Sequence, residues 1–181
     1  ITSKAKAVVC MPDSGSLNLQ LPPRCRILII GSGAAGLTAA VMAAEAGIKD
    51  IVVLEKEPIV GGSSMISGGQ WAVSETELQR RNGILDTDSI FYADMLRIGK
   101  NRNDPQLVKK LIQVSREQYN WVLEHGVAPL ALSAASGMSR PRAHTFDAVA
   151  VMNLLLRMAA RHNIPIITGA RATELLMSNG T

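Results

Sequence analysis

Three glycines, Gly31, Gly33 and Gly36, stand at the spacing G-x-G-x-x-G, and Glu55 follows 19 residues after the last of them. Glycines in this pattern permit a tight turn, let a pyrophosphate approach the backbone and let a helix pack closely on a strand. A carboxylate at that distance is placed to accept the two ribose hydroxyls of an adenosine. These residues therefore predict a dinucleotide site whose phosphates lie at a helix N-terminus.

The segments around these residues have the order that such a site requires. Residues 26–30 are rich in Ile and Leu and predict a strand buried on both faces. Residues 34–46 are small and apolar, which favours a helix packed on a sheet, and Gly47 is a natural end for it. Residues 51–54 predict a second strand that ends at Glu55. The alternative is a β-α-β unit with a glycine turn and no ligand.

A second glycine-rich stretch, G-G-S-S-M-I-S-G-G at 61–69, follows the second strand. Its backbone N–H groups and hydroxyls can approach an anion or a flat ring without large side chains in the way. A flexible surface loop is the alternative, but Met65 and Ile66 at its centre argue against simple exposure. We therefore interpret this stretch as a second ligand-binding loop.

Composition excludes several classes of protein. The 181 residues are 47% hydrophobic, and no apolar run is long enough to span a membrane. The net charge of +4 comes from 19 basic and 15 acidic residues without a basic cluster, and two Phe, two Tyr and two Trp offer little for base stacking, so nucleic acid is not expected. Cys10 and Cys25 lack a metal or haem spacing, so no metal site is predicted. Whether they pair is left open.

The rest of the chain predicts further elements. A strand is expected at 5–11, a turn at 12–15 and a polar, irregular surface crossing at 70–86. A helix at 90–99 is expected to be capped by Asp88 or Ser89, and Asp104-Pro105 begins another that ends at His125-Gly126. The inward face of that second helix is predicted from its apolar positions: Leu107, Val108, Leu111, Ile112, Val114, Trp121 and Val122.

Two Arg and one His gather at 140–144, where Arg140, Arg142 and His144 indicate either an anion site or a solvated turn. A helix at 146–161, a third parallel strand at 164–168 and a strand at 172–177 follow. Together these elements predict an α/β domain, Rossmann-like, with a mainly parallel sheet.

The combination G-S-G-A-A-G, V-V-L-E-K and G-G-S-S-M-I-S-G-G resembles the flavoprotein subunits of the fumarate reductase and succinate dehydrogenase family. This family includes soluble flavocytochrome-type fumarate reductases and related enoate reductases. The resemblance covers about six-sevenths of the chain, from Arg26 onward. It implies that 25–181 is the N-terminal part of an FAD-binding domain, incomplete, with a capping domain and C-terminal part beyond Thr181. Residues 1–24 are then an N-terminal arm or the remnant of a preceding domain.

The resemblance also implies a set of cofactor-binding residues. The FAD pyrophosphate would lie on the backbone of Gly31, Gly33, Ala34, Ala35 and Gly36. The remaining assignments are Glu55 and Lys56 for the adenosine ribose, Ser63 and Ser64 for the phosphate and ribityl region, Ser67, Gly68 and Gly69 for the isoalloxazine ring, and the Ala172 backbone for adenine.

Two departures from the family pattern matter. Members that bind flavin covalently carry a His in the segment that corresponds to 61–64, and none is present here, so the FAD is expected to be non-covalent. The glycine-rich stretch that usually follows Arg-Ala-His is missing, because Thr145 leads straight into a helix. No residue of this sequence is assigned a catalytic role, because the resemblance implies that the proton-donating Arg lies beyond Thr181.

The function implied by the resemblance is an FAD-dependent oxidoreductase. It would transfer hydride between flavin N5 and the carbon–carbon double bond of a small unsaturated carboxylate such as fumarate. An electron donor domain or protein would supply electrons to the flavin. The alternatives are a ketosteroid or succinate dehydrogenase-type flavoprotein and a non-catalytic FAD-binding fragment. Residues 1–181 alone are expected to be inactive. The compartment is left open, with the periplasm favoured over the cytoplasm.

Overall fold

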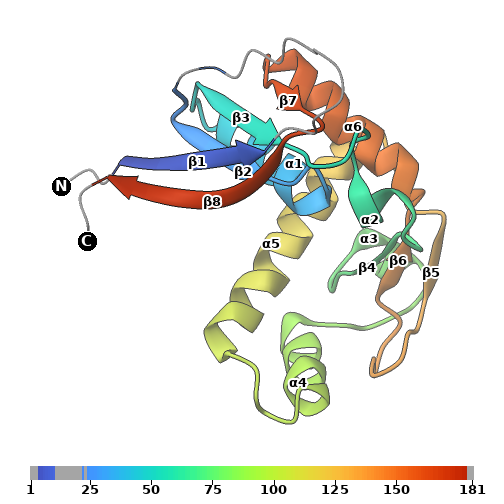
Figure 1. Cartoon of the computed structure of the whole chain (residues 1–181). Helices are drawn as coiled ribbons and strands as arrows, with labels where there is room; N and C mark the ends of the chain where they lie inside the picture. Colours follow the sequence, from blue (N-terminus) through green and yellow to red (C-terminus); the bar gives the residue numbers. More distant parts are fainter. Residues whose placement is uncertain (1–3, 11–21, 23, 179–181) are drawn as a thin grey trace. The chain divides into compact units, whose positions relative to one another are not determined.

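The computed structural model describes residues 4–10, 22 and 24–178. These residues form two compact units, of which unit 1 takes in residues 1–66 and 152–181 and unit 2 takes in residues 67–151. Figure 1 shows the course of the chain through both. No helix in the described part of the chain is both long and apolar enough to cross a membrane.

Unit 1 is built on a three-stranded parallel sheet in the order β2-β3-β7 (Figure 1). β2 (Ile27–Ile30) pairs with β3 (Ile51–Leu54) along its whole length, and β3 pairs with β7 (Ile166–Ile167). α1 (Ala34–Glu45) connects the first two strands and buries Leu37, Ala40 and Val41. The strand–helix–strand order predicted around the glycines is therefore confirmed.

The two central strands differ in burial. Every residue of β3 is buried, whereas β2 is half-buried and its Ile30 is 56% exposed. The prediction that β2 is buried on both faces is wrong because β2 lies at the edge of this sheet and lacks a neighbour on one side among the described strands.

A second, antiparallel sheet in unit 1 joins β1 (Lys4–Cys10) to β8 (Arg171–Ser178). Both strands were predicted. The sheet β2-β3-β7 is parallel, in keeping with the Rossmann-like prediction, whereas the other two described sheets are antiparallel. Unit 1 also holds α2 (Gly62–Met65) and most of α6 (Ala148–Arg161). The predicted turn at 12–15 lies outside the described residues. Cys25 carries a free thiol.

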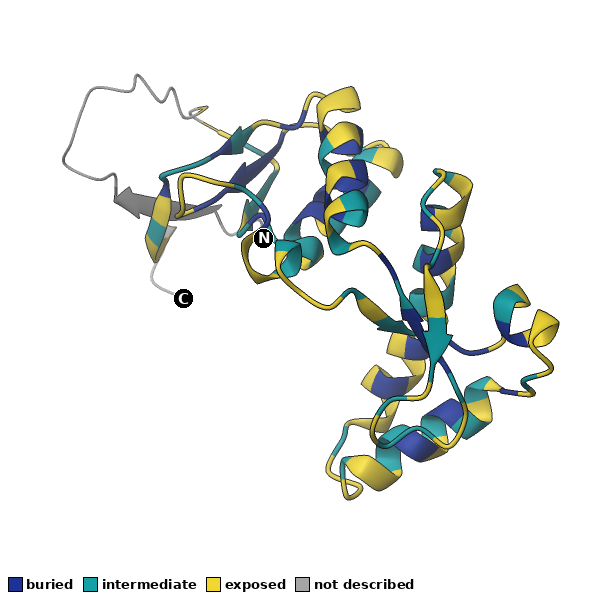
Figure 2. Ribbon diagram, turned by 90° about the vertical axis from the view of Figure 1, so that its right-hand side faces the viewer, coloured by how far each residue is buried: buried dark blue, intermediate teal, exposed yellow. Residues whose placement is uncertain are grey.

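Unit 2 contains an antiparallel sheet with strand order β4-β6-β5 and three helices. Its strands are β4 (Gln70–Ala72), β5 (Ala131–Ser133) and β6 (Ala143–Thr145), and its helices are α3 (Glu77–Arg81), α4 (Asp88–Ile98) and α5 (Pro105–Glu124). Phe91 on α4 packs with Val108 and Ile112 on α5. Buried residues are dark blue in Figure 2.

Several predictions for unit 2 need correction. Residues 70–86 are not an irregular surface crossing, because they form β4 and α3, and Thr76, Gln79 and Asp86 are buried. The cap of α4 is Thr87, whose Oγ1 accepts from the Ile90 N–H at 3.2 Å. Asp104 caps α5 as predicted, with Oδ1 accepting from the Gln106 N–H at 2.8 Å.

The inward face of α5 is rotated from the predicted one. Val108, Ile112, Tyr119 and Val122 are buried, whereas Leu107 is 68% exposed and Leu111 52%. α6 likewise begins at Ala148 rather than at 146, and Val149 in its first turn is exposed. In a helix with apolar residues on two adjacent faces, the sequence pattern does not decide which face is buried. Packing against the neighbouring elements decides it.

Candidate functional site

The glycine turn follows β2 at its carboxyl end, and the protein itself requires two of its glycines. Gly31 has φ of +102°, a conformation that residues with a side chain rarely adopt. A Cβ on Gly36 would lie 2.0 Å from the carbonyl oxygen of Gly31. The tight turn and the close packing of α1 on β2 therefore need glycine at these two positions, as predicted.

Gly33 is not required by the fold. It caps α1 with φ of −69° and ψ of 179°, which any residue can adopt. A Cβ there would meet Ser64 Oγ at 3.4 Å and the Gly61 carbonyl oxygen at 3.9 Å, which are ordinary contacts. The N-terminus of α1 is thus kept clear of a side chain without a structural reason, and such a clear helix N-terminus is what a phosphate needs.

Ser64 lies beside this helix N-terminus. Its Oγ accepts a hydrogen bond from the Ala34 N–H at 3.0 Å. Ser64 therefore lies at the point where an anion bound to this helix end would sit. The structure thus brings together the glycine turn and Ser64, which are 30 residues apart in the sequence.

Glu55 is 5% exposed at the carboxyl end of β3. Its Oε2 accepts from the Ser32 N–H at 2.9 Å and from the Ser32 hydroxyl at 2.7 Å, and its Oε1 accepts from the Glu57 N–H at 2.9 Å. Burial raises the pKa of Glu55, but hydrogen bonds led by the Glu57 N–H and the Ser32 hydroxyl hold it below the ordinary value. The carboxylate is therefore ionised at neutral pH and keeps its capacity to accept.

Ser32 was missed by the sequence analysis. It is fully buried between Gly31 and Gly33, and its Oγ also accepts from the Gly61 N–H at 3.1 Å. The signal that could have found it is its position, because Ser32 carries the only hydrogen-bonding side chain within G-S-G-A-A-G.

Comparison with known protein families identifies the family to which this chain belongs. The sequence profile described as "FAD binding domain" matches residues 26–181. The chain belongs to the FAD binding domain family. FAD, the cofactor expected from the sequence, is therefore confirmed for the family.

Known relatives agree with the predicted resemblance to fumarate reductase flavoproteins. NADH:fumarate oxidoreductase of Klebsiella pneumoniae is 30% identical over 162 residues, which are 87% of this chain and 17% of that protein. Fumarate reductase (cytochrome) of Shewanella frigidimarina is 31% identical over 155 residues, 83% of this chain and 27% of that protein. This FAD-binding domain thus spans between 17% and 27% of the length of these relatives.

A solved structure supports the same conclusion. The open conformation of a flavocytochrome c3 fumarate reductase superposes with a TM-score of 0.76 at 27% identity, over 81% of this chain and 27% of that one. The geometry of unit 1 fits the ADP part of FAD, because Gly33 leaves the N-terminus of α1 without a side chain and the ionised carboxylate of Glu55 stands at the end of the next strand.

The second glycine-rich stretch of this FAD-binding domain is not one loop. Residues 62–65 form the short helix α2, and the division between the units falls after Ile66. In unit 2, Gly69 has φ of +66°, and a Cβ on it would lie 2.0 Å from the Phe146 carbonyl oxygen. The Ser67 hydroxyl accepts from the Gly69 N–H at 3.4 Å, and Gly68 has open space beside it. The fold of unit 2 therefore requires glycine at position 69, whether or not a ligand binds there.

The remaining predicted residues lie in unit 1. Ala35 and Ser63 are exposed on α1 and α2. Lys56 follows Glu55, is exposed, and its Nζ lies 3.6 Å from a carboxylate oxygen of Glu57. Ala172 is half-buried in β8, in register with Val9 of β1.

Arg142 and His144 form neither an anion site nor a solvated turn, so both interpretations of that segment are wrong for them. Both side chains are completely buried. His144 Nδ1 donates to the Arg142 carbonyl oxygen at 2.9 Å, and Nε2 lies 2.9 Å from Thr76 Oγ1. Burial lowers the pKa of His144 although hydrogen bonds oppose it. Arg140 is exposed and donates to the Leu85 carbonyl oxygen at 3.2 Å.

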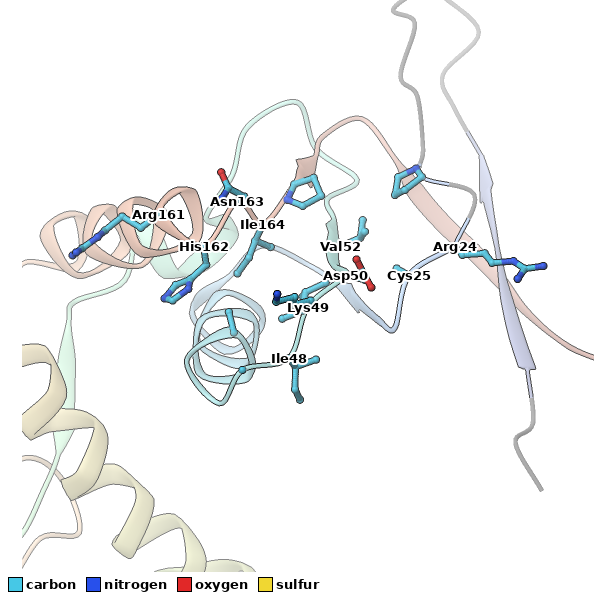
Figure 3. A pocket seen from close by; sticks show the side chains of 15 residues that line it. Arg24, Cys25, Ile48, Lys49, Asp50, Val52, Arg161, His162, Asn163 and Ile164 are labelled. Atoms are coloured by element: carbon cyan, nitrogen blue, oxygen red, sulfur yellow. The ribbon is translucent and has the colours of Figure 1, made fainter.

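A cavity of about 560 Å³ lies at the opposite end of the parallel sheet (Figure 3). It is lined by residues at the start of β3 and after the ends of α1 and α6, among them Cys25, Ile48, Asp50, Ile51, His162 and Ile164. The glycine turn and Glu55 follow the carboxyl ends of the strands, where ligands of open α/β sheets bind. The cavity is therefore separate from the candidate cofactor site.

Proposed function

We propose that this chain is the nucleotide-binding part of an FAD-dependent oxidoreductase that reduces the carbon–carbon double bond of a small unsaturated carboxylate such as fumarate. The observation that carries the cofactor assignment is Gly33, which keeps the N-terminus of α1 clear although the fold tolerates a side chain there. The substrate class is supported by the relatives, whose names identify them as fumarate reductases.

In this proposal the residues of unit 1 hold the ADP part of the cofactor. The glycine turn and the N-terminus of α1 bind the pyrophosphate, and Ser64, which accepts from the Ala34 N–H, lies beside it. Glu55 accepts a ribose hydroxyl through its carboxylate. The other assignments from the sequence, including Ser67, Gly68 and Gly69 for the flavin ring, remain predictions. No His occurs at 61–64, so we propose non-covalent binding.

We further propose that residues 25–181 are the N-terminal part of the FAD-binding domain and that 1–24 are an arm or the remnant of a preceding domain. The bound flavin supplies hydride to the double bond. A proton donor and a carboxylate-binding site are also needed. Of the candidates at 140–144, Arg142 and His144 are buried and hydrogen-bonded within unit 2, which supports a proton donor outside this chain.

The test is turnover by the full gene product purified with FAD. With reduced viologen as electron donor, fumarate or another small enoate should be reduced well above the rate of free FAD at equal concentration. A flavoprotein that leaves these acids unchanged but oxidises a 3-oxosteroid would overturn the substrate class. A protein purified without flavin that also fails to bind added FAD would overturn the proposal entirely.

A further inference from the structure

The Ser32 hydroxyl joins three separate segments of the candidate cofactor site. It donates to Glu55 Oε2 at 2.7 Å and accepts from the Gly61 N–H at 3.1 Å, while Ser32 itself belongs to the glycine turn. Glu55 stands on the ribose side of the proposed site. Gly61 caps α2, whose Ser64 accepts from the Ala34 N–H on the phosphate side. One buried hydroxyl therefore connects the ribose side to the phosphate side.

The two hydrogen bonds from Ser32 also decide which carboxylate oxygen can serve a ligand. Glu55 Oε2 receives both the N–H and the O–H of Ser32, and a carboxylate oxygen has about two acceptor positions. Oε1 receives the Glu57 N–H at 2.9 Å and is the oxygen that we assign to a ribose hydroxyl. Without the Ser32 hydroxyl, the carboxylate would keep only the Ser32 N–H as a contact with the turn and would be held less firmly in this orientation.

We propose that Ser32 is a positioning residue for FAD, whose hydroxyl orients the Glu55 carboxylate toward the ribose and ties it to Gly61 at the start of the phosphate-side segment. This inference rests on the proposed function. Ser32 touches Glu55 and Gly61 rather than the cofactor, so it acts through them. A purely structural role, in which Ser32 only satisfies a buried turn, would lower stability without changing how Glu55 binds.

The chain offers a matched control for that structural role. Ser74 in unit 2 is also buried, and its hydroxyl donates to an Asp88 carboxylate oxygen at 2.7 Å, the same length as the bond from Ser32 to Glu55. Ser74→Ala therefore removes a serine–carboxylate hydrogen bond in unit 2, whereas the residues proposed to hold the ADP part of FAD belong to unit 1.

The first experiment measures FAD affinity of the full gene product by quenching of flavin fluorescence. Ser32→Ala should weaken binding on the order of 10- to 100-fold, because a hydrogen bond to a charged group is lost. Ser74→Ala should change it less than about twofold. In a Glu55→Ala background, adding Ser32→Ala should have a much smaller effect than it has alone, because its target is gone.

The second experiment needs no cofactor. The carboxyl carbon of Glu55 is followed by NMR as the pH is lowered in FAD-free protein. Removing a donor to the ionised carboxylate should raise the pKa of Glu55 in Ser32→Ala and leave it unchanged in Ser74→Ala. The charged neighbours Lys56 and Glu57 pair with each other at 3.6 Å and are the same in all three proteins.

The outcomes separate the two proposals. Wild-type protein that does not bind FAD overturns the proposed function and this inference with it. An unchanged affinity in Glu55→Ala overturns the ribose assignment on which Ser32 acts. If Glu55→Ala weakens binding while Ser32→Ala behaves like Ser74→Ala in both experiments, the positioning role alone is overturned.

Discussion

The guanidinium of Arg142 and the carboxylate of Asp86 face each other through two hydrogen bonds, from Nε to Oδ2 at 2.9 Å and from Nη2 to Oδ1 at 2.8 Å, with both side chains fully buried. Arg142 Nη1 also donates to Asp94 at 2.6 Å, and the guanidinium lies 4.7 Å from the centre of the Phe91 ring. α4, which carries Phe91 and Asp94, and the loop before it, which carries Asp86, thus surround one buried cation that lies directly before β6.

Removing one partner of this buried pair should destabilise the protein strongly. Asp86→Ala leaves the Arg142 charge with only Asp94, and breaking a buried ion pair costs about 3–5 kcal/mol. The free energy of unfolding in urea should fall by that amount. The exposed Arg140 serves as the control, and Arg140→Ala should change it by less than about 0.5 kcal/mol. Equal effects of the two substitutions would contradict this account.

Asp94 should make stability depend on pH in the acidic range. Burial raises the pKa of Asp94, but hydrogen bonds from the Ser139 N–H, Arg142 and Arg97 outweigh it and hold the pKa well below the ordinary value. Because the folded pKa is the lower one, this stabilisation is complete above the unfolded pKa of about 3.9 and is lost as the pH falls below it. The difference in unfolding free energy between wild type and Asp94→Asn should be constant near neutral pH and shrink below about pH 4. A difference that grows on acidification would show that the sign is wrong.

Replacement by alanine should affect mainly stability at Gly36 and mainly FAD binding at Gly33. Gly36→Ala places Cβ 2.0 Å from a backbone oxygen and should unfold or strongly destabilise the protein. Gly33→Ala meets only ordinary contacts and should cost less than about 1 kcal/mol of stability, mainly through the cap. FAD retained after gel filtration of the full gene product should nevertheless fall for Gly33→Ala and further for Gly33→Val. Full retention in Gly33→Val would sink the assignment of the phosphate site.

Glu55 should contribute to FAD affinity through one or two charge-assisted hydrogen bonds. At about 1.5–3 kcal/mol, Glu55→Ala is expected to weaken binding on the order of 10- to 150-fold. An FAD titration measures this, and Glu77→Ala, which removes an exposed carboxylate in unit 2, indicates how much of the loss is specific to Glu55. A loss below threefold in Glu55→Ala would count against the ribose contact.

Residues 1–181 alone should not reduce fumarate. Reduction of a double bond needs an oriented hydride donor, a proton donor and a group that polarises the acceptor. Arg142 and His144 are hidden and engaged in the structural contacts described above. Loaded with FAD and supplied with reduced viologen, the isolated chain should show no more turnover than free flavin. Activity above that background would refute the prediction, and the exposed Arg140 would be the next residue to replace.

The cofactor half of the site could be predicted from the sequence because its determinants are local. A glycine turn, the helix it begins and the acid after the next strand follow one another within 30 residues, and each has a backbone or spacing requirement visible in the residue types. The positive φ of Gly31 and the contact at Gly36 are instances of those requirements. The N-cap of α5 at Asp104 is local in the same way.

What only the tertiary structure decided depends on residues far apart in the chain. Arg142 lies 56 residues from Asp86, and without that partner its charge and position were equally consistent with an anion site. Ser32 gained its role from Glu55 and Gly61, which are 23 and 29 residues away. Burial of a charge or a hydroxyl is favourable only when a partner meets it, and which distant residue does so is a property of packing that no local pattern encodes.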